Sequence, residues 1–357
     1  MAVTVSISCS CHKDSSRLTL RLRASVRRIS FTVKIPFSKD QLSQLEGEAE
    51  QLFKKICEQR CLPKESADRM PLFLFLNVMR GRTEHFDEQR QAHAQAIIQQ
   101  LLASKMRQQG RSDLQKVLPH VEWVNKGLPA DSIATAITHA LLLCDLELKL
   151  LLAPESHHFI ASDHRVVVLN QGFRDVVKGR SVGGIAMRGL QIFLPLSPQL
   201  AIMAFDSKCY RVGRPDQDAI ALNHSDDIRM INALQVLNCH KCIYFRDKED
   251  REICYNLIYK FSGKRVSIEE LTSIKNVSYQ GQNQLLIHAQ APSLPVPGKW
   301  SFCKVRQTFR PEDFNYRDPG TVKAVQAWEE AIWKRKKWMS FEDWADEYEW
   351  KHRPDDH

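Results

Sequence analysis

Apolar positions follow a helical period through most of the first 152 residues. Between residues 39 and 60 they recur every three or four positions after the capping-box sequence Ser-Lys-Asp-Gln at 38–41, which predicts an amphipathic helix. The same spacing predicts three more helices, from Ser66 to Arg80, from Phe86 to Gln109 and from Asp131 to about Leu152. The first part of the chain is therefore predicted to be helical.

From residue 156 the pattern changes to short apolar runs that are typical of strands. Four such runs are present, at 159–161, 166–169, 190–194 and 242–245. Helical spacing returns between the third and fourth runs, from Ser225 to Asn238, and again near 249–261. Strands and helices thus alternate irregularly in the second half.

These patterns predict an α+β fold in which a helical N-terminal layer packs on a small mixed β-sheet, followed by a helical C-terminal extension. We expect residues 1–35 to be a basic disordered arm or targeting segment, and 36–290 to be the main domain. Residues 291–357 would hold a linker and the extension. The Pro-rich sequence at 292–297 indicates the linker.

The chain is long enough to bury a sizeable core, and 43% of its residues are hydrophobic. Its net charge of +9 is unevenly placed: residues 1–35 carry +6 and residues 312–357 carry −4, which leaves +7 spread over the middle. A middle segment with this mild excess permits binding to nucleic acid but does not require it.

Ten cysteines in 357 residues are too sparse for a disulfide scaffold, so we expect reduced thiols in a cytoplasmic compartment. The Ser- and Arg-rich residues 1–35 also fit a mitochondrial or plastid transit peptide, or a mispredicted start, so the compartment stays open. No apolar run is long enough to cross a membrane, since the best candidate, 133–152, contains four charged or histidine side chains.

Asp163 is the first candidate for chemistry, because it directly follows a short apolar run and an ionised carboxylate there needs a partner. With His157, His158 and His164 close in sequence, it could form a metal site or an acid–base pair. The alternative is that Asp163 caps the turn through its side chain and the histidines lie on a solvent loop. Ser162 joins Asp163 among the catalytic candidates.

Arg82 and Arg80 follow the apolar face of the second predicted helix. Arg82 would either bind an anion in the site or form a bidentate ion pair with Asp163 that ties the helical half to the strand half. Asn232 lies on the core-facing side of its helix, and a buried Asn needs several partners. We expect it to bridge to the turn at 195–198, with a place in a pocket wall as the alternative.

The candidate catalytic residues are therefore Asp163, Arg82 and Ser162, and the candidate binding residues are Asn232, Arg80 and His164. We assign no metal and no cofactor. Cys239-His-Lys-Cys242 has the spacing of zinc ligands but lacks a second pair. A nucleophile elbow, a metalloprotease helix and a phosphate loop are all missing from the sequence.

Three short motifs resemble a widespread, mostly bacterial family, domain of unknown function 4238. They are Phe-Ile-Ala-Ser-Asp-His-Arg-Val at 159–166, Pro-Leu-Ser-Pro at 195–198 and Ile-Asn at 231–232, and they fall in the family's order. The sequence Leu-x-x-x-Arg-x-Arg-Thr at 76–83 is similar to its Arg-Thr-Pro helix. The resemblance covers roughly 36–260 and implies the family domain, but no settled biochemistry comes with it.

The sequence departs from the family pattern at several positions. Ala161 stands where Thr is usual, Arg165 and Glu84 stand where Pro is usual, and the His-x-Val-Pro-type opening is absent. If that histidine does chemistry in relatives, this copy would be inactive.

Two functions follow as hypotheses. The first is a toxin- or defence-type effector that acts on nucleic acid, a possible nuclease, with Asp163 and Arg82 in its site. The second is a non-catalytic binding module in which the same motif residues are structural. The tryptophans between 328 and 350, beside the basic run at 334–337, either stack on bases or form a protein-docking segment, and we favour docking back onto the domain. A third hypothesis, an organelle-targeted protein of unrelated duty, rests on residues 1–35 alone.

Overall fold

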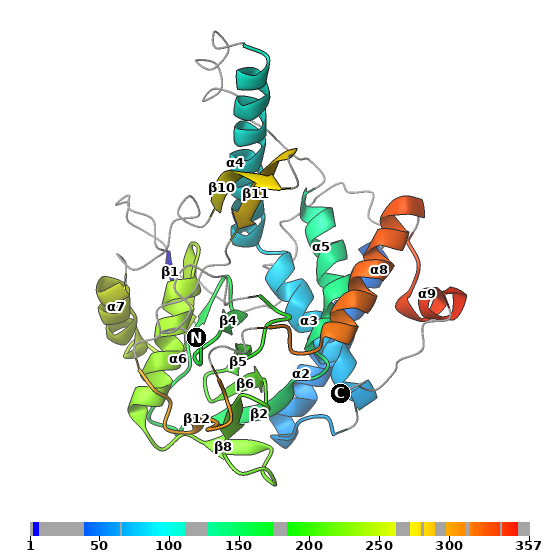
Figure 1. Cartoon of the computed structure of the whole chain (residues 1–357). Coiled ribbons are helices and arrows are strands. Elements are labelled where there is room, and N and C mark those ends of the chain that lie inside the picture. Colours follow the sequence, from blue (N-terminus) through cyan, green and yellow to red (C-terminus); the bar gives the residue numbers. More distant parts are fainter. Residues whose placement is uncertain are drawn as a thin grey trace.

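The computed structural model of the chain describes residues 3–6, 39–64, 66–110, 128–173, 184–261, 272–279, 282–289, 298–310, 315–335 and 338–348 (Figure 1). Most of the predicted arm at 1–35, the linker at 292–297, Lys336, Lys337 and Trp350 lie outside these residues. The fold is α+β, as the hydrophobic pattern predicts.

A five-stranded mixed sheet forms the centre, with the strand order β4-β5-β6-β2-β8. Its strands are β4 (Val167–Leu169), β5 (Gln191–Ser197), β6 (Leu200–Phe205), β2 (Glu147–Leu152) and β8 (Ala219–Ala221). All neighbours run antiparallel except β2 and β8, which are parallel. The predicted runs at 166–169 and 190–194 are therefore confirmed as strands.

Both faces of this sheet are covered, because successive side chains of each strand point to opposite sides. One face presents Leu151, Phe193 and Met203 to helix α6 (Ser225–Asn238) through Ile231 and Leu234. The other presents Leu150, Ile192 and Ile202 to helices α2 (Lys39–Gln59) and α3 (Ser66–Gly81) through Ile56, Leu72 and Phe73. The sheet is thus the middle layer between two helical layers.

The N-terminal helical layer consists of α2 (Lys39–Gln59), α3 (Ser66–Gly81), α4 (Glu84–Gln108) and α5 (Leu128–Thr138). In Figure 1 α4 projects from the top of the molecule, beside the hairpin of β10 (Thr272–Tyr279) and β11 (Gln282–Ala289). The long helix predicted from Asp131 to Leu152 is wrong. The chain leaves α5 for a 3₁₀ turn, η3 (His139–Leu143), and then enters β2.

The reason for that error is the burial of β2. Leu148 and Leu150 contact one helical layer and Leu151 the other, so the run is buried on both faces of the sheet and shows no alternation. Leucine favours helix by intrinsic propensity, and the tertiary pairing of β2 with β6 and β8 overrides that preference.

A second, smaller sheet lies beyond α6, with the order β1-β9-β3. It is built from β1 (Val3–Ser6), β9 (Cys242–Phe245) and β3 (Ala161–Ser162), and α7 (Asp250–Phe261) packs beside it. β7 (Tyr210–Val212) and β12 (Cys303–Val305) form a separate pair. The predicted elements at 225–238, 242–245 and 249–261 are confirmed within a residue.

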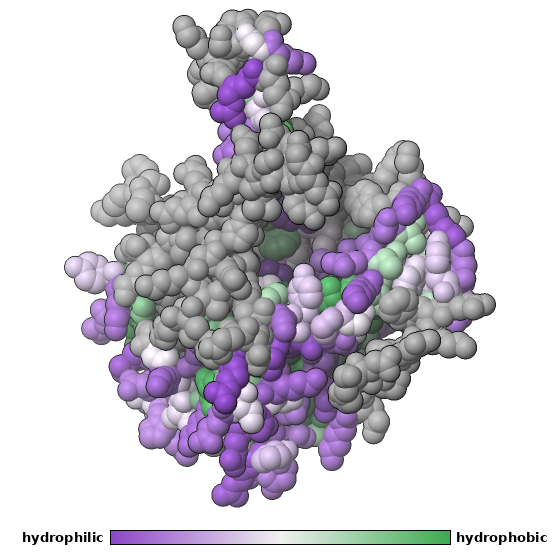
Figure 2. All heavy atoms as spheres, viewed as in Figure 1, coloured by the Kyte–Doolittle hydropathy of each residue, from purple (hydrophilic) through white to green (hydrophobic). Residues whose placement is uncertain are grey.

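The C-terminal extension folds back on the main domain through helices α8 (Pro319–Arg335) and α9 (Phe341–Glu347). Trp328 and Trp344 pack together with Leu141 of η3, and the Glu329 carboxylate lies 3.2 Å from His139 Nε2. On the face drawn in Figure 2 the described surface is mostly hydrophilic, with small apolar areas along α8. Within the described residues, no helix has the length and apolar content that a membrane crossing needs.

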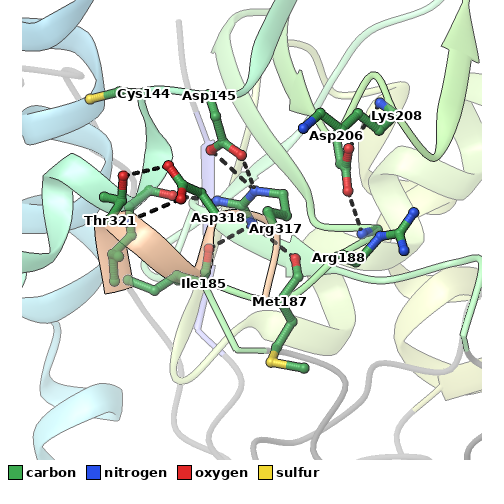
Figure 3. A network of polar contacts seen from close by, with 12 residues as sticks. Cys144, Asp145, Ile185, Met187, Arg188, Asp206, Lys208, Arg317, Asp318 and Thr321 are labelled. Atoms are coloured by element: carbon green, nitrogen blue, oxygen red, sulfur yellow. Dashed lines mark hydrogen bonds and ion pairs between the residues drawn. The ribbon is translucent and has the colours of Figure 1, made fainter. Parts of the chain in front are cut away.

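Arg317 anchors the extension, as Figure 3 shows. Its guanidinium is 8% exposed and donates from Nε to Asp145 at 2.9 Å, and from Nη1 to the carbonyls of Ile185 and Met187 at 2.8 and 2.9 Å. Nη2 donates to the carbonyl of Leu142. A buried guanidinium needs a partner for each of its donors, so Arg317 fixes the start of the extension to two separate segments, 142–145 and 185–187.

Candidate functional site

Helix α6 holds the 158–166 segment through three side-chain amides spaced one turn apart. Asn232 accepts from Ile160 N at 3.0 Å and donates to His158 O at 2.8 Å. Gln235 accepts from Ser162 N at 3.0 Å and donates to Arg165 O at 2.9 Å. Asn238 donates to the carbonyls of His164 and Val166. Because this spacing puts the three amides on one helix face, they bond a segment that is mostly outside any strand.

Asn232 is therefore a bridge, but its partner is not the one we predicted. It bonds the backbone of 158–160 instead of the turn at 195–198. Asn232 is linked to that turn only through the segment it bonds, because Phe159 N donates to Pro198 O at 2.7 Å. Ser162 is fully buried, and its hydroxyl donates to Gln235 Oε1 at 3.0 Å.

Asp163 binds the turn that leads from α6 into β9. Its carboxylate accepts from the backbone N–H groups of His240 at 2.9 Å, Lys241 at 2.7 Å and Cys242 at 3.0 Å. Its own N–H donates to Cys242 O at 3.0 Å. About four acceptor positions are available on a carboxylate, and three are filled here by backbone donors.

Arg82 and Asp163 do not pair with each other in the part of the chain that the structure describes. Arg82 instead pairs with Glu46 of α2 and donates to Met79 Sδ at 2.8 Å, so it links α3 to α2. Arg80 stacks over the Phe86 ring at 5.1 Å, and burial lowers the pKa of its guanidinium to about 10. Arg80 therefore remains charged at neutral pH.

Arg165 lies near Arg82, and burial first, then that neighbouring charge, lower the pKa of its guanidinium, while Tyr244 opposes the shift. His164 is 5% exposed and both ring nitrogens are buried. The predicted residues thus share one region around α3, β3 and α6, and none of Asp163, Arg82 and Asn232 lines the pockets found among the described residues.

A pocket of about 590 Å³ opens on the other side of the same segment. We call it the His158 pocket. Its lining combines Glu155 and His158 before β3, the turn after β5, the end of α2 and the residues after β9, which are Cys57, Arg60, Glu155, His158, Ser197, Gln199, Leu200, Arg246 and Asp247. Ser197 belongs to the Pro-Leu-Ser-Pro motif. The amide contacts of α6 with His158 O and Ile160 N fix one wall of this pocket.

His158 and Asp250 form a dyad at this wall. His158 Nδ1 lies 3.0 and 3.2 Å from the two carboxylate oxygens of Asp250, whose side chain is 9% exposed. Because an ionised carboxylate only accepts, Nδ1 carries the proton and the lone pair of the neutral ring is on Nε2. Nε2 has no protein partner among the described residues.

Arg60 enters the pocket from a strained backbone position directly after α2. Its φ of 51° is the one positive value at a non-glycine residue among the described ones, and its N–H closes the last turn of the helix on Ile56 O at 2.8 Å. A side chain in this conformation costs about 1 kcal/mol relative to glycine. Its guanidinium has no partner within the described chain.

The remaining charged groups of the pocket balance one another in part. Arg246 Nε lies 3.6 Å from Asp247 Oδ2, which is itself 3.7 Å from His158 Nδ1. Glu155 also lines the pocket. Burial, and then Glu58, raise the pKa of the Cys57 thiol, so it stays protonated at neutral pH. Among the described residues, Arg60 is therefore the cation of this pocket that has no counter-ion.

Two groups of side chains in the described residues have metal-ligand spacing. His158, Asp247 and Asp250 have ligand atoms within 4.8 Å of one another, and so do Glu84, Glu88 and His240. In the second group His240 Nε2 is 3.4 Å from Glu88, and Glu84 pairs with Lys241. These contacts join α4 to the turn that Asp163 binds.

Sequence reasoning placed His158 beside Asp163 but missed Asp250, Arg60 and Arg246. Asp250 is the second residue of the helix predicted near 249–261 and the first of α7, and Arg60 is the last residue of the predicted helix at 39–60. Positions at helix ends were legible in the sequence. The sequence does not show that Asp250 contacts His158 in the fold, or that Arg60 lines the same pocket as His158.

The comparisons with known proteins give one match. A family described as "Protein of unknown function (DUF4238)" matches residues 40–249, which is more than half of the chain. No curated protein and no solved structure matches. The matched residues include every residue that lines the His158 pocket.

Proposed function

The chain belongs to the DUF4238 family of proteins of unknown function, and we propose that it binds a small anionic ligand in the His158 pocket. The observation that carries this proposal is the guanidinium of the exposed residue Arg60, which lines the pocket from a positive-φ position and has no partner among the described residues. Residues in such conformations persist where the surrounding structure holds them, and they cluster at ligand sites.

The pocket has the size and lining that a small ligand needs. Its volume of about 590 Å³ lies within the usual range for ligand sites. Arg60 and Arg246 can each offer two parallel N–H donors to a phosphate or carboxylate group. His158 and Ser197 add further polar groups along the wall.

This proposal follows the second hypothesis from the sequence, a binding module in which the motif residues are structural. The contacts of Asp163, Ser162 and Asn232 support it, because each bonds backbone or helix groups of the scaffold. The effector hypothesis with Asp163 and Arg82 in one site has less support, since those side chains have separate partners. A nucleotide or the end of a nucleic acid carries phosphate and therefore belongs to the proposed class of ligands.

The test is a calorimetric titration in which inorganic phosphate is added to the full chain at constant ionic strength. Arg60→Gly should weaken phosphate binding by about tenfold, the loss of one charge-assisted contact. The same variant should melt at the wild-type temperature or slightly above it, because glycine removes the backbone strain.

Lys54→Gln is the matched control. It removes one positive charge from the same helix at a side chain that is 75% exposed and does not line the pocket. It should leave phosphate binding unchanged. Equal binding by wild type and Arg60→Gly, or no phosphate binding by wild type, would refute the proposal.

A further inference from the structure

We propose that His158 is the general base of a phosphate-ester hydrolysis carried out in the His158 pocket. This inference rests on the proposed anion binding by Arg60 and Arg246. The dyad carries it, because a histidine whose Nδ1 is fixed by a buried carboxylate presents its other nitrogen in a defined direction and tautomer.

Asp250 is a positioning residue for this chemistry. It is 6% exposed, it lies at the start of α7, and one of its oxygens also accepts from Asp247 N at 3.1 Å. The carboxylate is therefore fixed from two sides. It holds the His158 ring in place and stabilises the imidazolium that forms when Nε2 takes up a proton.

Water is the nucleophile that the pocket supports best. Cys57 is a protonated thiol at neutral pH, because burial raises its pKa. The hydroxyl oxygen of Ser197 accepts from Gln199 N at 3.3 Å, and the described contacts give it no base to remove its proton. His158 Nε2 is the available base at this pocket wall.

The step is a hydrolysis without redox change. Nε2 takes one proton from a water molecule while the water oxygen forms a bond to phosphorus. The bond from phosphorus to the ester oxygen breaks with its electron pair, the departing oxygen takes a proton from solvent water, and the imidazolium releases its proton to solvent. Arg60 and Arg246 neutralise the charge that the phosphoryl oxygens carry.

The experiment measures nitrophenol release by the full chain from p-nitrophenyl phosphate and from bis(p-nitrophenyl) phosphate, which separates monoester from diester substrates. His158→Asn is the decisive variant. Its amide can still donate to Asp250, as Nδ1 does, but it lacks Nε2. We expect the rate to fall by about a hundredfold or more, while phosphate affinity stays within about threefold.

His157→Asn is the matched control, because Ser156 is the one polar partner of its ring within the described part of the chain, at 2.9 Å, and His157 does not line the pocket. It should keep the wild-type rate. Asp250→Asn should shift the acid limb of the pH–rate profile to lower pH, an effect that a purely structural role would not produce. The other charged groups facing the ring, Asp247, Glu155, Arg60 and Arg246, stay unchanged in that comparison.

The outcomes separate the two proposals. Hydrolysis of either ester that His158→Asn abolishes supports the general base. Phosphate binding without hydrolysis, or equal rates in wild type and His158→Asn, overturns the general base and leaves the binding proposal standing. Absence of phosphate binding overturns both.

Discussion

Replacing Asp163 with alanine should destabilise the protein strongly, because its carboxylate is the partner of three backbone N–H groups. The N–H groups of His240 and Cys242 are partly buried, and each would lose a charge-assisted hydrogen bond. The N–H of Lys241 can turn to water. A loss of about 1–1.5 kcal/mol for each partly buried donor and less for the third gives roughly 3 kcal/mol.

That loss corresponds to a fall in melting temperature of about 6–12 °C for a domain of this size. The melting temperature of Asp163→Asn should fall by about half as much. The amide oxygen of Asn can accept from two of the N–H donors, while its NH2 group faces the third. Thermal unfolding followed by circular dichroism measures both variants. Asp226→Ala is the control. In the described residues the side chain of Asp226 pairs with the exposed Arg229, so its removal should cost under about 0.5 kcal/mol. If Asp163→Ala has the melting temperature of the wild type, the turn does not depend on this carboxylate.

Two further predictions concern the core and the extension. Arg317→Met should lower the free energy of unfolding by about 2–4 kcal/mol, because three carbonyls lose their donor. Limited proteolysis of this variant should then cleave the extension before the main domain. Simultaneous digestion of both parts would contradict this prediction. Burial raises the pKa of the Cys254 and Cys303 thiols to about 12 from an ordinary value of 9.0. Because these thiols lose their protons at lower pH in the unfolded chain, the free energy of unfolding should hold up to about pH 9 and fall above it. The fall should be less steep in Cys254→Ala. A urea midpoint that stays constant from about pH 8 to 10.5 would contradict this prediction.

The sequence predicted the helices of this fold better than its strands. In α2, Ala49, Leu52 and Ile56 recur at helical spacing because this helix buries one face. β2 has two buried faces, so its leucines carry no period that separates a strand from the end of a helix. Its strand state depends on pairing with β6 and β8, which lie about 50 and 70 residues further along the chain.

The site was predictable only where its residues adjoin a motif. Asp163 stood out because a carboxylate after an apolar run needs a partner, and its partners are backbone groups of a turn 77–79 residues away. A backbone donor has no sequence signature. The sequence therefore could not separate a capping role from a catalytic one. Asp250 was hidden for a different reason, since an acidic residue at a helix start is ordinary.

The geometry also changes how a loss of function in the motif should be interpreted. Asn232 bonds His158 O and Ile160 N, and Asp163 fixes the end of the same segment. A variant at either residue can displace the His158 ring without touching a ligand, and a shift of about 1 Å is enough to slow a reaction severely. Activity alone would then wrongly identify Asp163 as catalytic. His158→Asn keeps the segment and removes one nitrogen, so its rate at an unchanged melting temperature is the measurement that separates chemistry from scaffold.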